Sequence, residues 1–124
     1  MNIPESYQTV MPYLIVNNAA GFMSFTEKVF GAKEKLKYMR DEKTIMHAEI
    51  TIGGDSTIMF ADTTEEFKVS TAGLFIYVEN ADATFQKAID EGATVVRKIT
   101  NQDYGRSGGI KDPFGNIWWI TTPK

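Results

Sequence analysis

The only histidine of the chain, His47, lies two positions before Glu49 in the stretch Thr44–Ile52 (TIMHAEITI). Apolar and polar residues alternate there, so we predict a strand in which both side chains point to the same face. A carboxylate beside an imidazole can orient and charge it, which makes the two residues a candidate acid/base pair for catalysis. The alternatives are a half-exposed strand with ordinary polar residues, a structural histidine, or a metal site that uses both side chains.

A second candidate is the glycine-rich stretch Tyr104–Gly109 (YGRSGG), which we interpret as a loop. Its glycines permit close backbone approach and motion. Arg106 could bind a carboxylate or phosphonate through two parallel hydrogen bonds. The alternative is an arginine that forms a surface ion pair. Tyr104 could stack on a ligand or cover the site.

Composition excludes several kinds of function. The chain has no cysteine and a single histidine, which excludes disulfides, thiolate metal sites and a zinc site of several histidines. A net charge of −3 with scattered lysines gives no basic surface, so we expect no nucleic-acid partner. The sequence has neither a signal pattern nor an apolar run of membrane-spanning length, so we expect a cytoplasmic protein without membrane contact.

The elements that must position these residues occur in the same order in both halves of the chain. The first half predicts a strand, a helix between Asn18 and Gly31, and three strands, over residues 10–16, 33–40, 44–52 and 56–61. The second half predicts a strand, a helix between Asn80 and Gly92, and three strands, over residues 74–78, 94–100, 106–111 and 116–122. We therefore predict a single domain of two βαβββ modules, at about 9–62 and about 72–122, joined by a polar linker over 63–71.

The last predicted strand follows a turn, Asp112-Pro113-Phe114-Gly115-Asn116, in which the side chain of Asp112 should cap the backbone. Neighbouring residues of a strand point to opposite faces. Trp118, in phase with Ile120, should pack beneath a helix. Trp119 should face the other side of the sheet.

The repeat resembles the vicinal-oxygen-chelate superfamily of glyoxalase I, bleomycin-resistance proteins and extradiol dioxygenases. The resemblance rests on the paired βαβββ order, on Phe30-Gly31-Ala32 and Gly92-Ala93 after the helices, and on the turn from Asp112 to Asn116. His47-Ala48-Glu49, Gly105-Arg106 and the Asp112–Trp118 stretch are similar to the PhnB-like subgroup. The resemblance implies an α+β fold whose mixed sheets curve into a cup with the helices outside, and a homodimer.

In metal-dependent members of that family, ligands lie on the first and fourth strands of each module. The resemblance places these positions at Met11, Met59 (or Phe60), Gly73 and Trp119. None of these side chains offers the oxygen or nitrogen ligand that a divalent ion prefers. We therefore expect no cofactor and no glyoxalase I activity, although a divalent metal in a rearranged site with His47 and Glu49 stays open.

Several large side chains share the phase that faces the predicted cup. They are Met11, Tyr13, Met59, Phe75 and Trp119. Apolar and aromatic side chains with a few polar groups are typical of a small-molecule site, and the alternative is a filled core.

The function we expect is metal-free binding of a small, partly apolar or aromatic molecule. The expected contact residues are Met11, Tyr13, Met59, Tyr104, Arg106 and Trp119. The alternative is a lyase- or isomerase-type enzyme that uses His47 and Glu49 on an oxygen-rich small substrate, with or without a divalent metal.

Overall fold

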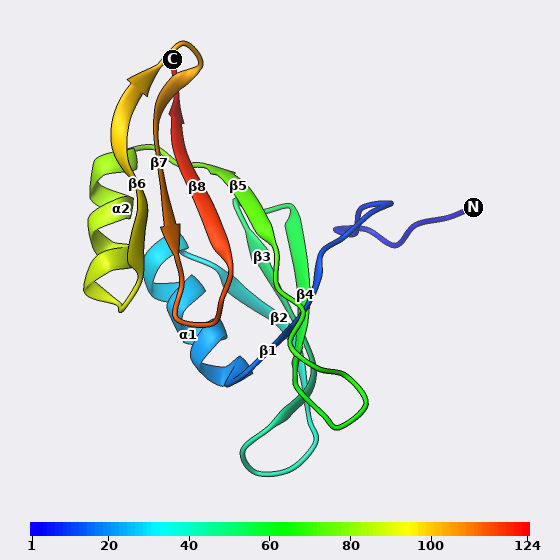
Figure 1. Ribbon diagram of the computed structural model, residues 1–124. Coiled ribbons are helices and arrows are strands. Elements are labelled where there is room, and N and C mark those ends of the chain that lie inside the picture. The colour runs from blue at the N-terminus through cyan, green and yellow to red at the C-terminus, as the bar shows by residue number, and fades with distance from the viewer.

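The computed structural model describes residues 1–124 and contains two βαβββ modules, as the repeat predicts (Figure 1). The first module comprises β1 (Tyr13–Val16), α1 (Ala19–Phe30), β2 (Lys33–Met39), β3 (Ile45–Ile52) and β4 (Ser56–Asp62). The second comprises β5 (Gly73–Tyr77), α2 (Ala81–Asp90), β6 (Thr94–Gln102), β7 (Gly105–Lys111) and β8 (Ile117–Pro123). The predicted α+β class and the duplication are confirmed.

Each module forms one four-stranded mixed sheet, in the order β1-β4-β3-β2 and β5-β8-β7-β6. The first strand of each module runs parallel to the last strand, and the remaining neighbours are antiparallel. A parallel pair needs a long crossover connection, which begins in each module with the helix. Neither helix is long and apolar enough to cross a membrane.

The helix ends match the predicted caps. Asn18 Oδ1 accepts a hydrogen bond from the Gly21 amide at the start of α1, and Asn80 Oδ1 accepts one from the Ala83 amide at the start of α2. Gly31 ends α1 with a φ of 68°, a left-handed conformation that glycine adopts without the steric cost of a Cβ.

Both helices pack on one face of the sheets, and α1 contacts both modules. In the first module, the ring of Phe22 meets the ring of Phe60 at a centroid distance of 4.9 Å. Phe30, at the end of α1, lies 4.4 Å from Trp118 of the second module, and Trp118 is only 1% exposed. The prediction that Trp118 packs beneath a helix is confirmed, and the helix belongs to the other module.

The turn before β8 is organised by one buried carboxylate. Asp112 Oδ1 accepts hydrogen bonds from the amides of Phe114 and Asn116. Its Oδ2 accepts from Asn116 Nδ2 and from the indole nitrogen of Trp118. The predicted capping role of Asp112 is confirmed, and the same carboxylate also fixes the indole of Trp118.

The first strand begins at Tyr13, later than the predicted Val10. Pro12 has no amide hydrogen to donate, and it joins the sheet only through its carbonyl, which accepts from the Met59 amide at 3.0 Å. Met11 therefore precedes the ladder. In the register of the parallel pair, Tyr13 is the partner of Met59.

The predicted strand over residues 106–111 is confirmed and begins one residue earlier, so the interpretation of Tyr104–Gly109 as a loop is wrong from Gly105 onwards. Residues from Gly105 onwards form β7, an inner strand between β6 and β8. A Cβ on Gly108 would lie 2.9 Å from the Ile99 amide nitrogen of β6. Glycine is therefore required here by close backbone approach within the sheet.

We call the surface of each sheet opposite the helices its open face. Figure 1 shows the segment before β1 on this side of the first sheet, away from the helices. Alternation along the strands separates the faces: in β5, Leu74 and Ile76 pack against the core, whereas Phe75 and Tyr77 are exposed. The candidate residues described below lie mainly on these open faces.

Candidate functional site

Tyr13, Met59 and Glu49 form a row across the open face of the first sheet. Tyr13 of β1 is the register partner of Met59 of β4, and Met59 is the partner of Glu49 of β3. His47 lies two residues from Glu49, with its ring stacked on that of Tyr13 at a centroid distance of 5.4 Å. The structure thus brings together four of the residues that the sequence singles out.

A chain of hydrogen bonds connects the polar members of this group. The hydroxyl of Tyr13 lies 2.8 Å from His47 Nδ1, and His47 Nε2 lies 2.7 Å from Glu49 Oε2. Tyr7, from the segment before β1, donates its hydroxyl hydrogen to Glu49 Oε1 at 2.5 Å. With a neutral imidazole every bond has a donor: Tyr13 donates to Nδ1 and Nε2–H donates to Glu49.

The electrostatics of this chain favour a charged carboxylate between neutral phenols. Burial raises the pKa of Glu49, but the hydrogen bonds from Tyr7 and His47 lower it, and the net pKa is below its usual value. Burial, and then the negative charge of Glu49, raise the pKa of Tyr13. The hydrogen bond to Glu49 also raises the pKa of Tyr7. Tyr13 is therefore a neutral hydrogen-bonding group at neutral pH and not a phenolate base.

The exposed end of the chain borders a hollow of about 840 Å³ on the open face of the first module. Tyr13 is 46% exposed, and it shares this hollow with Met46 of β3 and with Phe67 of the linker. The charged side chains that line it are those of Arg40, Asp62, Glu65, Glu66 and Lys68. The hollow combines an apolar floor with a charged rim, which suits a small molecule with both kinds of group.

A second row crosses the open face of the other sheet. Phe75 of β5 is the register partner of Trp119 of β8. Trp119 is in turn the partner of Gly109 in β7, and Gly109 is the partner of Arg97 in β6. The guanidinium carbon of Arg97 lies 5.2 Å from the Trp119 ring centroid, within the range of a cation–π contact. Trp119 points to the open face, as predicted.

Gly109 allows the Trp119 ring to lie flat on the sheet. A Cβ on Gly109 would lie 2.5 Å from Trp119 Cζ3 and 2.7 Å from Cε3, distances that real Cβ contacts do not adopt. Two tyrosines extend the aromatic surface around this row. Tyr77 lies 5.1 Å from Phe75 by ring centroids, and Tyr104 lies 6.4 Å from Phe75 while its hydroxyl accepts from Arg97.

Arg106 lies apart from both rows. It forms a bidentate ion pair with Asp82 in the first turn of α2, with nitrogen–oxygen distances of 2.6 and 3.0 Å. A further hydrogen bond joins it to Asn101 Oδ1. This is the ion-pair alternative considered for Arg106, on the helix side of the sheet.

The residues at the family's metal positions do not fit a metal. Met59 and Trp119 lie opposite Tyr13 and Phe75, and none of these four side chains is a carboxylate or an imidazole. No group of three or more histidine, aspartate, glutamate or cysteine side chains is close enough to hold an ion. The one adjacent imidazole and carboxylate, those of His47 and Glu49, form hydrogen bonds to each other and to Tyr13 and Tyr7.

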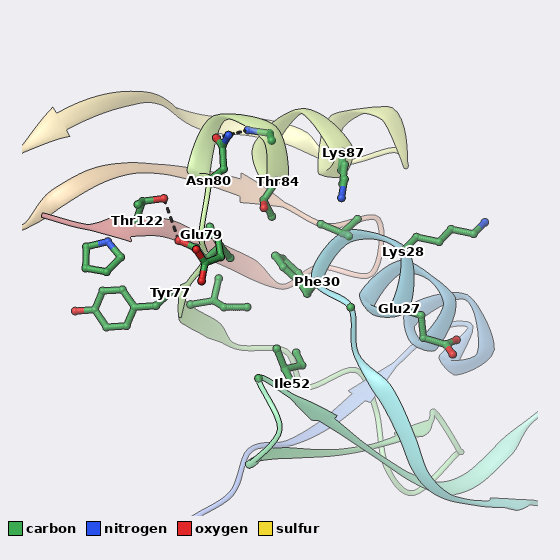
Figure 2. A pocket seen from close by; sticks show the side chains of 17 residues that line it. Glu27, Lys28, Phe30, Ile52, Tyr77, Glu79, Asn80, Thr84, Lys87 and Thr122 are labelled. Carbon is green, nitrogen blue, oxygen red and sulfur yellow. Dashed lines mark hydrogen bonds between the residues drawn. The ribbon is translucent and has the colours of Figure 1, made fainter.

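A further hollow, of about 910 Å³, lies where α1, β3, β5 and α2 meet (Figure 2). Phe30, Ile52 and Tyr77 line it from three different elements, and Lys28 and Lys87 belong to the two helices. None of the candidate catalytic or ligand-binding residues predicted from the sequence lines it. The hollow contains no member of either row, and Tyr77, which contacts Phe75, is its link to the second row.

The fold and the rows together define a class of protein: two βαβββ modules whose open sheet faces carry aromatic side chains and a short polar chain. Over residues 7–120 the sequence matches the Glyoxalase/Bleomycin resistance protein/Dioxygenase superfamily, and the chain belongs to this superfamily. The uncharacterized protein Mb0911c from Mycobacterium bovis is 32% identical over 124 residues, which cover 90% of this chain and 81% of that protein.

Solved structures share the fold at lower identity. TioX from Micromonospora sp. ML1 has a TM-score of 0.75 and 20% identity, with 95% of this chain and 100% of TioX covered. The putative 3-demethylubiquinone-9 3-methyltransferase, PhnB protein, from Bacillus cereus has a TM-score of 0.72 and 19% identity. The match covers 93% of this chain and 99% of the Bacillus cereus chain. TnmS3, an antibiotic binding protein from Streptomyces sp. CB03234, has a TM-score of 0.69 and 17% identity. The match covers 95% of this chain and 100% of TnmS3.

Sequence reasoning missed Arg97 and Tyr7, and it did not predict the contact of Gly109 with Trp119. Arg97 and Gly109 join the aromatic row only through strand register, which alternation of residues does not determine. The pair of glycines preceding Ile110 was the available signal, because glycine inside a strand often marks close approach of another group. No local pattern connects Tyr7 to Glu49.

Proposed function

We propose that this protein binds a small, partly aromatic molecule over the open face of its second sheet, without a metal. The observation that carries the proposal is the row from Phe75 through Trp119 to Arg97. Phe75 is 52% exposed, and Trp119 is half-buried, with Gly109 beneath its ring and the Arg97 guanidinium 5.2 Å from its centroid. Clustered exposed aromatic side chains typically mark a binding surface.

The chemistry of the row suggests the kind of ligand. A planar ring can stack on the exposed Phe75 and contact the part of Trp119 that remains exposed, and Arg97 supplies a positive charge beside the rings for a carboxylate or phenolate. The description of TnmS3 as an antibiotic binding protein supports the same class of function within this fold. Bleomycin-type sequestration, in which the ligand is bound and not changed, needs no metal ligands.

Tryptophan fluorescence tests this proposal. We expect at least one planar aromatic compound of a diverse panel to quench the emission saturably in the parent protein. In Trp119→Phe the buried Trp118 remains, and the ligand-dependent quenching should disappear. If no compound quenches the parent, or if Trp119→Phe is quenched equally, the proposed surface is wrong.

The metal-free part of the proposal has its own test. The lack of suitable side chains at the family's ligand positions supports it. Elemental analysis of protein purified without chelators should find well below one equivalent of nickel, zinc, manganese or iron. About one tightly bound equivalent per chain would contradict it.

A second candidate function is a lyase- or isomerase-type reaction on the first module. The hydrogen-bonded chain from Glu49 through His47 to Tyr13 supports it, because it ends at a phenol that faces a hollow. His47 would accept a proton from the substrate while Glu49 stabilises the imidazolium, and the neutral Tyr13 hydroxyl would hydrogen-bond to a substrate oxygen. If an activity is found, His47→Gln should remove it with little change in melting temperature, and full retention would dismiss this candidate.

The remaining expectations accompany the proposal. We propose a PhnB-like relationship within the superfamily, a homodimer and a cytoplasmic location, with no nucleic-acid or membrane partner. The net charge of −3 is the support for excluding nucleic acid. Sedimentation over a range of concentrations would test the dimer directly.

A further inference from the structure

Part of the open face of the first module is covered by the chain's own residues 1–12, which we call the strap. The Tyr7 hydroxyl reaches Glu49, a carboxylate that is only 4% exposed. The carbonyl of Ser6 accepts from the hydroxyl of buried Thr57 at 2.6 Å and from Lys35 Nζ at 3.1 Å. Glu49 and Thr57 thus lie beneath the strap.

The Tyr7 ring lies in a site whose contacts resemble those of a ligand pocket. Lys35 Nζ lies 3.5 Å from the ring centroid, so a cation covers the ring face. The strands β2 and β3 shift register between Glu34 and Leu36, and Lys35 occupies this irregularity. A buried carboxylate then receives the hydroxyl hydrogen. The recognised chemistry is an aromatic ring with one hydroxyl donor.

The strap itself is weakly attached. Residues 1–6 are exposed, and no β-ladder bond joins the chain to the sheet before Pro12. Ser6 has a φ of 70°, which is unfavourable for a residue other than glycine. The buried Oε1 of the Gln8 side chain has no hydrogen-bond partner, which costs free energy in the covered state. These features oppose the few bonds that hold Tyr7 in place.

We propose that Tyr7 occupies a subsite for a hydroxylated aromatic ring, and that such a ligand binds by displacing the strap. The incoming ring lies against Lys35 and donates its hydroxyl hydrogen to Glu49. His47 keeps its bond to Glu49, so the carboxylate remains oriented during the exchange. This subsite lies on the first sheet and does not depend on the proposed binding surface of the second.

Because the strap competes with the ligand, the apparent affinity of the subsite is its intrinsic affinity multiplied by the fraction of molecules in which the strap is open. Removing the Tyr7 side chain removes this competition while leaving Lys35 and Glu49 in place. The natural probe is 4-methylphenol, the tyrosine side chain as a free molecule. Toluene has the same ring and methyl group without the hydroxyl, so it isolates the contribution of Glu49.

The experiment compares the parent with Tyr7→Ala by NMR titration, using the ring signals of His47 as the reporter in the first module. We expect 4-methylphenol to bind Tyr7→Ala about tenfold or more tightly than the parent. The affinity of toluene should increase much less between the parent and Tyr7→Ala. In the parent, saturating 4-methylphenol should shift the Tyr7 ring signals toward those of an unstructured tyrosine.

Matched variants complete the test. Ile3→Ala changes an exposed strap residue and should bind like the parent, and Trp119→Phe should leave the subsite affinity unchanged. Glu49→Gln in the Tyr7→Ala background should lose most of the gain for 4-methylphenol, with folding verified by tryptophan emission. Equal affinities of parent and Tyr7→Ala, an equal gain for toluene, or unshifted Tyr7 signals at saturation would each overturn the proposal.

Discussion

Glu49 is the residue through which pH should act on the first module. Its pKa is raised by burial but lowered further by the bonds from Tyr7 and His47, so the folded value lies below the unfolded one. A carboxyl with a lowered folded pKa stabilises the fold above its unfolded pKa, about 4.3, and this stabilisation is lost as pH falls through the folded pKa. Glu49 therefore contributes at neutral pH and not in strong acid.

We expect Glu49→Gln to lower the free energy of unfolding by roughly 1–3 kcal/mol at pH 7, because hydrogen bonds to a buried charge are lost. Urea denaturation at pH 7, 5 and 3 should show the gap from the parent narrowing at the acid end. Glu34→Gln, at an exposed carboxylate of β2, should behave like the parent throughout. A gap of constant size across this pH range would contradict the assignment.

Asp112 is the residue on which the turn before β8 depends. It accepts hydrogen bonds from two backbone amides, from Asn116 and from the Trp118 indole, and it is buried. Asp112→Ala leaves these donors without partners, so we expect a loss of about 3 kcal/mol or more in urea denaturation. Asp55→Ala, at an exposed turn, is the control. A loss below about 1 kcal/mol would mean that water replaces the carboxylate.

At the scale of elements, β7 positions the aromatic surface of the second sheet. Gly109→Ala would place a methyl group 2.5 Å from Trp119 Cζ3, so the ring must leave its place on the sheet and its contact with Arg97. We expect altered Trp119 emission and about tenfold weaker binding of any ligand that quenches it.

Gly73→Ala is the matched control for this prediction. Gly73 also lies in a strand of the second sheet, it has no positive φ, and a Cβ there would meet no atom within 4 Å. The tryptophan emission and the ligand affinity of Gly73→Ala should remain those of the parent. Unchanged binding in Gly109→Ala would show that the flat position of Trp119 is unnecessary.

The sequence predicted elements better than it predicted contacts between them. Caps such as Asn18 and Gly31, and the alternation that separates Trp118 from Trp119, are local signals, and the structure agrees with both. The strand over residues 106–111 was predicted correctly, but the interpretation of its glycines as a loop was wrong, because they reflect close packing within a sheet and not freedom of the backbone. Tyr7 lies far in sequence from Glu49, and no periodicity connects them.

At the scale of the whole molecule, α1 joins the two modules into one unit. Phe30 packs on Trp118, and Phe114 of the second module meets Phe22 and Phe25 of α1 at centroid distances of 5.9 and 6.2 Å. A single hydrophobic cluster contains residues of both modules. We therefore expect the modules to unfold together, although their sheets are separate.

The chain offers a natural reporter for each module, since its only histidine lies in the first and both tryptophans lie in the second. Tryptophan emission and the His47 ring signal should give the same urea midpoint in the parent. Phe114→Ala should lower both urea midpoints together, with a loss of about 2 kcal/mol or more in the free energy of unfolding, because it removes a ring from the contact between modules. Phe67→Ala, at an exposed linker position, should lower neither. Separate midpoints for the two reporters would show instead that each module is stable without the other, and that the contact through α1 adds little to the fold.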